Sequence, residues 1–69
     1  MATIKGKIRE AEAGLKVAGR DFYVRYINAL LRSSMSQRAT NAYVEAAERW
    51  GFVVVHVDLL GEQIEDKTV

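Results

Sequence analysis

Two different hydrophobic periods follow each other in the second half of the chain. Small and aromatic residues first recur at helical spacing, at Ala39, Ala42, Tyr43, Ala46, Ala47 and Trp50. Gly51 interrupts this pattern, and the next six residues (Phe-Val-Val-Val-His-Val) are rich in β-branched side chains. The pattern therefore predicts a helix from about Gln37 to Trp50, capped by Ser36 or by Ser34 with Gln37, and a strand over Phe52–Val57.

A lone strand needs a partner, because its backbone N–H and C=O groups must be paired. The first residues offer one candidate, since Thr3–Ile8 alternates polar and apolar side chains. The same residues also begin a helical seam made of Ile4, Ile8, Ala11, Leu15 and Ala18. We favour a helix over Lys7–Val17 with extended residues before it. The strand then pairs either with this short N-terminal strand or with its own copy in a homodimer.

The middle of the chain predicts another helix, over Asp21–Arg32, with Gly19 as the break before it and Asp21 as its cap. Its apolar residues cover more than one face, which is typical of a helix at a bundle centre or a subunit interface. The expected fold class is α+β, with three short helices and one C-terminal strand. We expect one small domain over residues 1–61 and a polar, frayed tail over residues 62–69.

Composition narrows the chemistry of the chain. It has 69 residues, 49% hydrophobic, with one histidine and no cysteine. Disulfides, thiolate metal ligands and cysteine nucleophiles are therefore excluded. The sequence has no apolar run of about 18 residues, which a membrane span needs, and no secretory leader is recognisable, so we expect a cytoplasmic protein. A chain of this size buries only about 60% of its unfolded-state surface, which favours a homodimer.

His56 is the one histidine of the chain, the residue type used most often as a general base, and Asp58 lies on the same side of the predicted strand. This pair fits an Asp-oriented general base, but no motif supplies a nucleophile beside it. Glu62, Glu65 and Asp66 read as a solvated acidic tail rather than a cation site. We therefore expect no enzyme activity, no cofactor and no metal.

Nucleic-acid binding is the alternative that the charge pattern raises. The net charge is +1, with +4 on residues 1–34 and −3 on residues 35–69. A helix-turn-helix arrangement would place Val53–Val55 in the recognition helix, where no side chain could read a base edge. Phosphate contacts would then have to come from the basic side chains Lys5, Lys7, Arg9 and Arg38.

Interface chemistry points instead to a protein partner. Tyr and Arg are enriched at binding hot spots, and one helical turn carries Tyr23, Arg25 and Tyr26. We predict that this turn contacts the partner. The predicted dimer strand comprises Phe52, Val53, Val54, Val55, His56 and Val57. The expected function is a non-enzymatic protein-binding regulator or inhibitor acting as a homodimer, of the kind that phages and bacteria encode as small accessory proteins. The alternative is a small dimeric DNA-binding transcriptional regulator.

Overall fold

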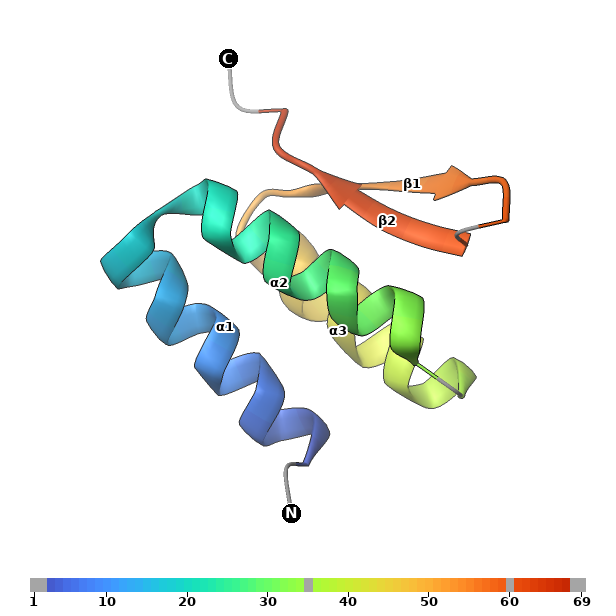
Figure 1. Ribbon diagram of the computed structural model, residues 1–69, viewed down its shortest axis with the longest axis horizontal. Coiled ribbons are helices and arrows are strands. Elements are labelled where there is room, and N and C mark those ends of the chain that lie inside the picture. The colour runs from blue at the N-terminus through green and yellow to red at the C-terminus, as the bar shows by residue number, and fades with distance from the viewer. Residues whose placement is uncertain (1–2, 35, 60, 68–69) are drawn as a thin grey trace.

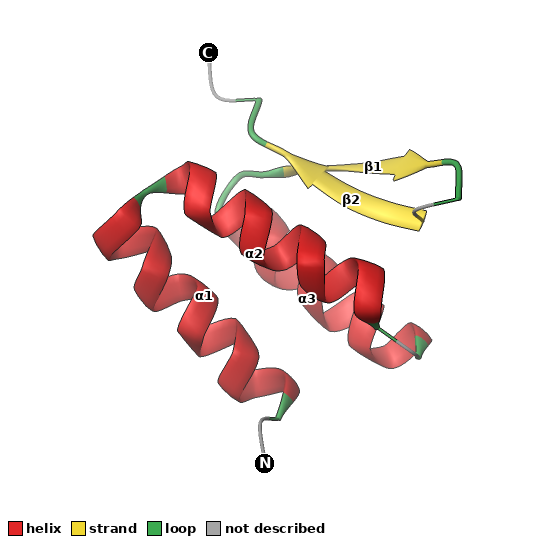
Figure 2. Cartoon of the chain, viewed as in Figure 1, coloured by secondary structure: helices red, strands yellow, loops and turns green. Residues whose placement is uncertain are grey.

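A computed structural model describes residues 3–34, 36–59 and 61–67. Within these ranges the elements are α1 (Ile4–Ala18), α2 (Arg20–Ser33), α3 (Gln37–Arg49), β1 (Val53–Val57) and β2 (Gly61–Glu65). The α2–α3 pair forms the middle of the molecule, with α1 on one side and the two strands on the other (Figure 1). The α+β class with three helices is thereby confirmed (Figure 2).

The strand partner of β1 lies in the segment expected to be a frayed tail. β1 and β2 form an antiparallel hairpin in which Val54 faces Ile64 and His56 faces Glu62. Residues 62–65, expected to belong to a frayed tail, therefore form part of a strand, and of the two candidate partners the Thr3–Ile8 segment is helical from Ile4 onward. The sequence Gly-Glu-Gln-Ile-Glu has weak β propensity, so its conformation depends on tertiary contacts, above all on Ile64, which is only 1% exposed.

The helix ends follow from local capping, with two differences from expectation. Thr3 Oγ1 accepts a hydrogen bond from the N–H of Gly6 at 2.9 Å, so α1 begins at Ile4, and residues 4–6, expected to be extended, are helical. Gly19, with φ of 94°, ends α1 and also occupies the N-cap of α2. Asp21 therefore lies in the first turn and is not the cap. Ser36 caps α3 as predicted, since its hydroxyl accepts from the N–H of Ala39 at 3.1 Å.

Close packing explains one glycine inside α1. The aromatic ring of Phe22 lies so near Gly14 that a Cβ atom at this position would overlap it. The absence of a side chain thus lets α2 approach the backbone of α1, although glycine costs about 1 kcal/mol relative to alanine within a helix.

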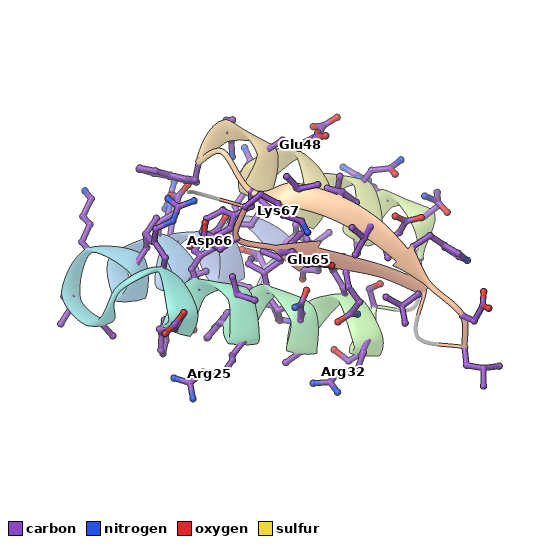
Figure 3. The ribbon with its side chains drawn as sticks, turned by 90° about the horizontal axis from the view of Figure 1, so that it is seen from above. Arg25, Arg32, Glu48, Glu65, Asp66 and Lys67 are labelled. Carbon is purple, nitrogen blue, oxygen red and sulfur yellow. The ribbon has the colours of Figure 1, made fainter. Side chains whose placement is uncertain are left out.

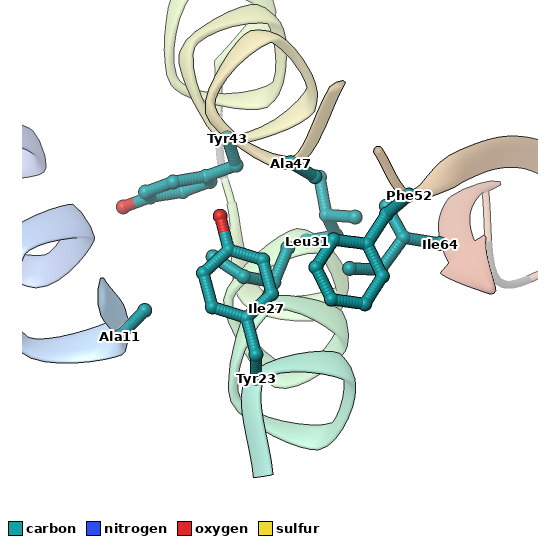
Figure 4. Packing of buried hydrophobic residues seen from close by; sticks show 8 residues of the cluster. All are labelled: Ala11, Tyr23, Ile27, Leu31, Tyr43, Ala47, Phe52 and Ile64. Atoms are coloured by element: carbon teal, nitrogen blue, oxygen red, sulfur yellow. The ribbon is translucent and has the colours of Figure 1, made fainter. Parts of the chain in front are cut away.

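All three layers contribute to a single hydrophobic core (Figure 4). Its buried members are Ala11, Tyr23, Ile27, Leu31, Tyr43, Ala47, Phe52 and Ile64. The rings of Tyr23 and Phe52 stack with centroids 4.8 Å apart. The guanidinium group of Arg20 lies 4.1 Å from the Phe52 ring centroid and pairs with Asp66 at 2.9 Å. These contacts hold the start of α2 against the open end of the hairpin, where β1 begins and β2 ends.

Candidate functional site

The two edges of the hairpin differ. On the β2 side, the side chain of Asn28 behaves like a neighbouring strand residue. Its Nδ2 donates to the carbonyl oxygen of Ile64 at 3.1 Å, and its Oδ1 accepts from the N–H of Ile64 at 2.7 Å. Since Asn28 belongs to α2, this helix covers the β2 edge at Ile64, the fourth of its five residues, and satisfies the backbone of that residue.

The same contact defines which backbone groups of β1 point outward. Both polar groups of Ile64 turn toward α2, so Ile64 and Val54 form a pair that exchanges no hydrogen bonds. The N–H and C=O of Val54 therefore point to the opposite edge, and those of His56 do the same two residues later. No hydrogen bond between described residues reaches these groups. The β1 edge is open, and its sequence contains neither lysine nor proline, the residues that commonly block an edge.

The solvent side of β1 carries a row of apolar side chains. Val54 faces the core with Ile64, so the alternate residues Val53, Val55 and Val57 share the outer face. We call these three residues the valine row. Val53 is 39% exposed, and Leu59 in the turn beyond the row is fully exposed. Apolar surface and an open edge therefore meet on the same strand.

The helical turn predicted to contact a partner divides among three environments. Tyr23 is fully buried, so it offers no atoms to a partner in the folded chain. Tyr26 is half-buried and donates its hydroxyl hydrogen to Glu10 Oε2 at 2.6 Å. Arg25 points away from the molecule (Figure 3). It also borders a groove between α2 and β2. Partner contact by Arg25 and Tyr26 stays a prediction.

Phe52 also departs from its expected role, because it lies outside β1 and only 4% of it is exposed. The sequence did contain a signal for the burial of Tyr23. Tyr23, Ile27 and Leu31 recur every four residues, and this is the stripe of α2 that the structure buries.

His56 lies on an exposed part of the hairpin. Its Nδ1 is 3.6 Å from Glu62 Oε1 on the facing strand, so Glu62 is its nearest ionic partner and Asp58 is not. The other carboxylates of the segment are held separately, Glu65 by Lys67 at 3.0 Å and Asp66 by Arg20. In the parts of the chain that the structure describes, no three side chains among His, Asp and Glu gather as metal ligands would.

A groove between α1 and α3 was not predicted. Its volume is about 300 Å³, and it is lined by Ile4, Lys5, Ile8, Arg38, Ala42, Glu45 and Arg49. We call it the cationic groove, because three basic side chains and one carboxylate border an apolar floor. Lys5, Arg38 and Arg49 form no ion pair with any described residue. Its charged residues are scattered over 45 positions of the sequence, so only the packing of α1 against α3 brings them together.

Among the described residues, no helix combines the length and apolar character that crossing a membrane requires. Compared with protein-family models, with curated proteins and with solved structures, the chain has no significant match.

Proposed function

We propose that the protein is a cytoplasmic, non-enzymatic interaction protein that acts as a homodimer and regulates or inhibits another protein by occupying its surface. The observation that carries this proposal is the difference between the two hairpin edges. Asn28 satisfies Ile64 on the β2 edge, whereas the outward N–H and C=O groups of Val54 and His56 have no partner among the described residues. An unprotected edge of this kind is a template for pairing with another strand.

A second copy of β1 fits this edge in one register particularly well. With a two-fold axis at Val55, the Val54 of each copy faces the His56 of the other, and their outward backbone groups form the narrow hydrogen-bonded pairs. Both valine rows then lie on one face of a four-stranded sheet. No like charges face each other, because β1 contains no acidic or permanently charged residue. The dimer also enlarges a core that is small in a single chain.

Sedimentation equilibrium across the micromolar range tests this arrangement. Val55→Lys places two ammonium groups opposite each other at the axis, so we expect a folded monomer. Val55→Thr is the matched control, since it keeps the branched shape without a charge, and we expect it to remain dimeric. Circular dichroism of each variant establishes that the fold is intact. A wild-type protein that is folded and monomeric at these concentrations overturns the homodimer.

The charge on α3 argues against a DNA-binding regulator. Arg38 and Arg49 share its exposed surface with Glu45 and Glu48, so the helix presents no net positive charge to a phosphate backbone. The segment that a helix-turn-helix would use for recognition is strand β1. Retention on duplex DNA that weakens steeply with salt would contradict the protein-binding function and favour this alternative.

A further inference from the structure

The cationic groove lies away from the edge proposed to join two copies. It is bordered by α1 and α3, whereas the hairpin packs on the opposite side of the α2–α3 pair (Figure 1). α1 packs more closely against α2 than against α3, which leaves the groove between α1 and α3 partly open. A homodimer formed through β1 therefore leaves both grooves available to a partner.

The groove combines two kinds of surface. Ile4, Ile8 and Ala42 supply apolar atoms, and none of the three is fully exposed or fully buried. Around them stand Lys5, Arg38 and Arg49, all exposed and without an ion pair in the described chain, against the single carboxylate of Glu45. A volume of about 300 Å³ is at the lower end of small-molecule pockets and suits one or two inserted side chains.

We infer that the cationic groove binds an acidic amphipathic helix of the regulated protein, with apolar side chains over Ile4, Ile8 and Ala42 and carboxylates at Lys5, Arg38 and Arg49. A helix laid into a groove between two helices is a recurrent mode of protein recognition. Opposite charges at the rim steer the encounter and set the orientation, and the apolar contact supplies the specificity for an amphipathic sequence. The inference rests on the proposed function, since it names the chemistry of the partner that the module binds.

Two other occupants fit less well. A nucleic acid would meet the carboxylate of Glu45 inside the groove and would find no aromatic lining residue on which a base could stack. A second copy could offer the acidic residues near β2, but Glu65 and Asp66 are already held by Lys67 and Arg20. The net charge of the groove thus points to a different chain with free carboxylates.

Three labelled synthetic peptides of one length test the inference by titration into the full-length protein. The first places leucine at helical spacing with glutamate beside it, the second has the same composition in scrambled order, and the third replaces each leucine with serine. We expect the first to bind and to shift backbone amide resonances of α1 and α3, and the other two to bind at least about tenfold more weakly, as loss of a buried apolar anchor predicts.

Charge reversal at the rim provides the second arm. Arg38→Glu should weaken the first peptide by roughly fivefold or more, because one attraction is replaced by a repulsion. Lys16→Glu is the matched control, because it makes the same change of net charge at an exposed position of α1 outside the groove. It should change the affinity for the first peptide by less than twofold.

Four results overturn the inference: no binding of the first peptide, equal binding of the scrambled peptide, equal effects of the two reversals, or tighter binding of a duplex DNA of matched charge. Sedimentation of the same samples separates this failure from that of the proposed function. If the protein is a dimer that does not bind the first peptide, the proposed homodimer stands and the cationic groove is not its partner site.

Discussion

The central α2–α3 pair is covered very differently on its two sides. On the hairpin side, Phe52 and Ile64 are buried, and Asn28 bonds twice to the backbone of β2. On the α1 side, Ala11 is the one fully buried residue of the helix, and the polar contacts come from exposed carboxylates. We therefore expect the hairpin to be held more firmly than α1, although α1 is longer. Deeply buried side chains and paired backbone groups contribute more to stability than the length of an element does.

Truncating the apolar anchor of each side should give the largest difference. Ile64→Ala removes a side chain that is 1% exposed, and we expect it to lower the free energy of unfolding by about 3–4 kcal/mol. Ile8→Ala on α1 removes a half-buried side chain and should cost about 1–2 kcal/mol. Urea unfolding followed by circular dichroism measures both. Equal losses would show that the two sides are equally anchored.

Loss of a polar contact should also cost more stability on the hairpin side than on the α1 side. Asn28→Ala leaves the N–H and C=O of Ile64 without partners beside the core, which we expect to cost about 2–3 kcal/mol. Glu12→Ala removes the acceptor of the Trp50 indole N–H at an exposed site and should cost less than about 1 kcal/mol. Thermal unfolding compares the two variants, and a larger effect of Glu12→Ala would reverse the comparison.

The contact between α1 and α2 at Gly14 should have an intermediate effect. Gly14→Ala gains helix propensity but forces the Phe22 ring to move, so we expect a net destabilisation of about 1–2 kcal/mol. In a Phe22→Ala background the overlap disappears, and the same substitution should then stabilise by up to about 1 kcal/mol. A stabilising Gly14→Ala in the parent sequence would mean that Phe22 moves freely.

The smallest effect at neutral pH is expected at Tyr23, whose hydroxyl is buried with no hydrogen-bond partner among the described residues. Tyr23→Phe should therefore leave stability unchanged or raise it by about 1 kcal/mol. Burial, with a lesser contribution from Glu12, raises the pKa of Tyr23 to about 12, whereas Arg49 acts in the opposite direction. Among the described residues, Tyr23 of α2 thus contributes a buried hydroxyl without a hydrogen bond to the core.

The loss of stability at alkaline pH tests the burial of the Tyr23 hydroxyl. A tyrosine whose folded pKa is raised above the unfolded value of about 10 stabilises the protein fully below pH 10, and this stability is lost as the pH rises toward 12. Tyr23→Phe should flatten the decline. Some slope should remain, because the hydrogen bond to Glu10 raises the pKa of Tyr26 as well, and Tyr26→Phe measures that part. A decline unchanged by Tyr23→Phe contradicts the burial of its hydroxyl.

The sequence predicted the elements that carry a local signal. The alanine-rich period of α3 and the valines of β1 were sufficient, because residues close in sequence determine both. β2 could not be recognised from Gly-Glu-Gln-Ile-Glu, since Ile64 is its one large apolar residue and Asn28 is 36 positions away. Hot-spot chemistry predicts a surface position for Tyr23, whereas its four-residue period with Ile27 and Leu31 predicts burial, and the period is the signal that agrees with the structure.

The candidate surfaces were predictable to different degrees. The dimer strand rests on a local pattern, and residues 53–57 do form a strand. The cationic groove depends on α1 meeting α3, which no local pattern encodes, so only the tertiary arrangement reveals it.

The contact of Asn28 with β2 also bears on the size of the proposed assembly. A sheet with two open edges can add copies without end, as amyloid fibrils do. Here α2 satisfies the outward backbone groups of Ile64, so in the proposed homodimer each outer strand is covered at this residue. We therefore expect strand addition in the proposed homodimer to end after one step, with the amide of Asn28 opposing further growth at Ile64.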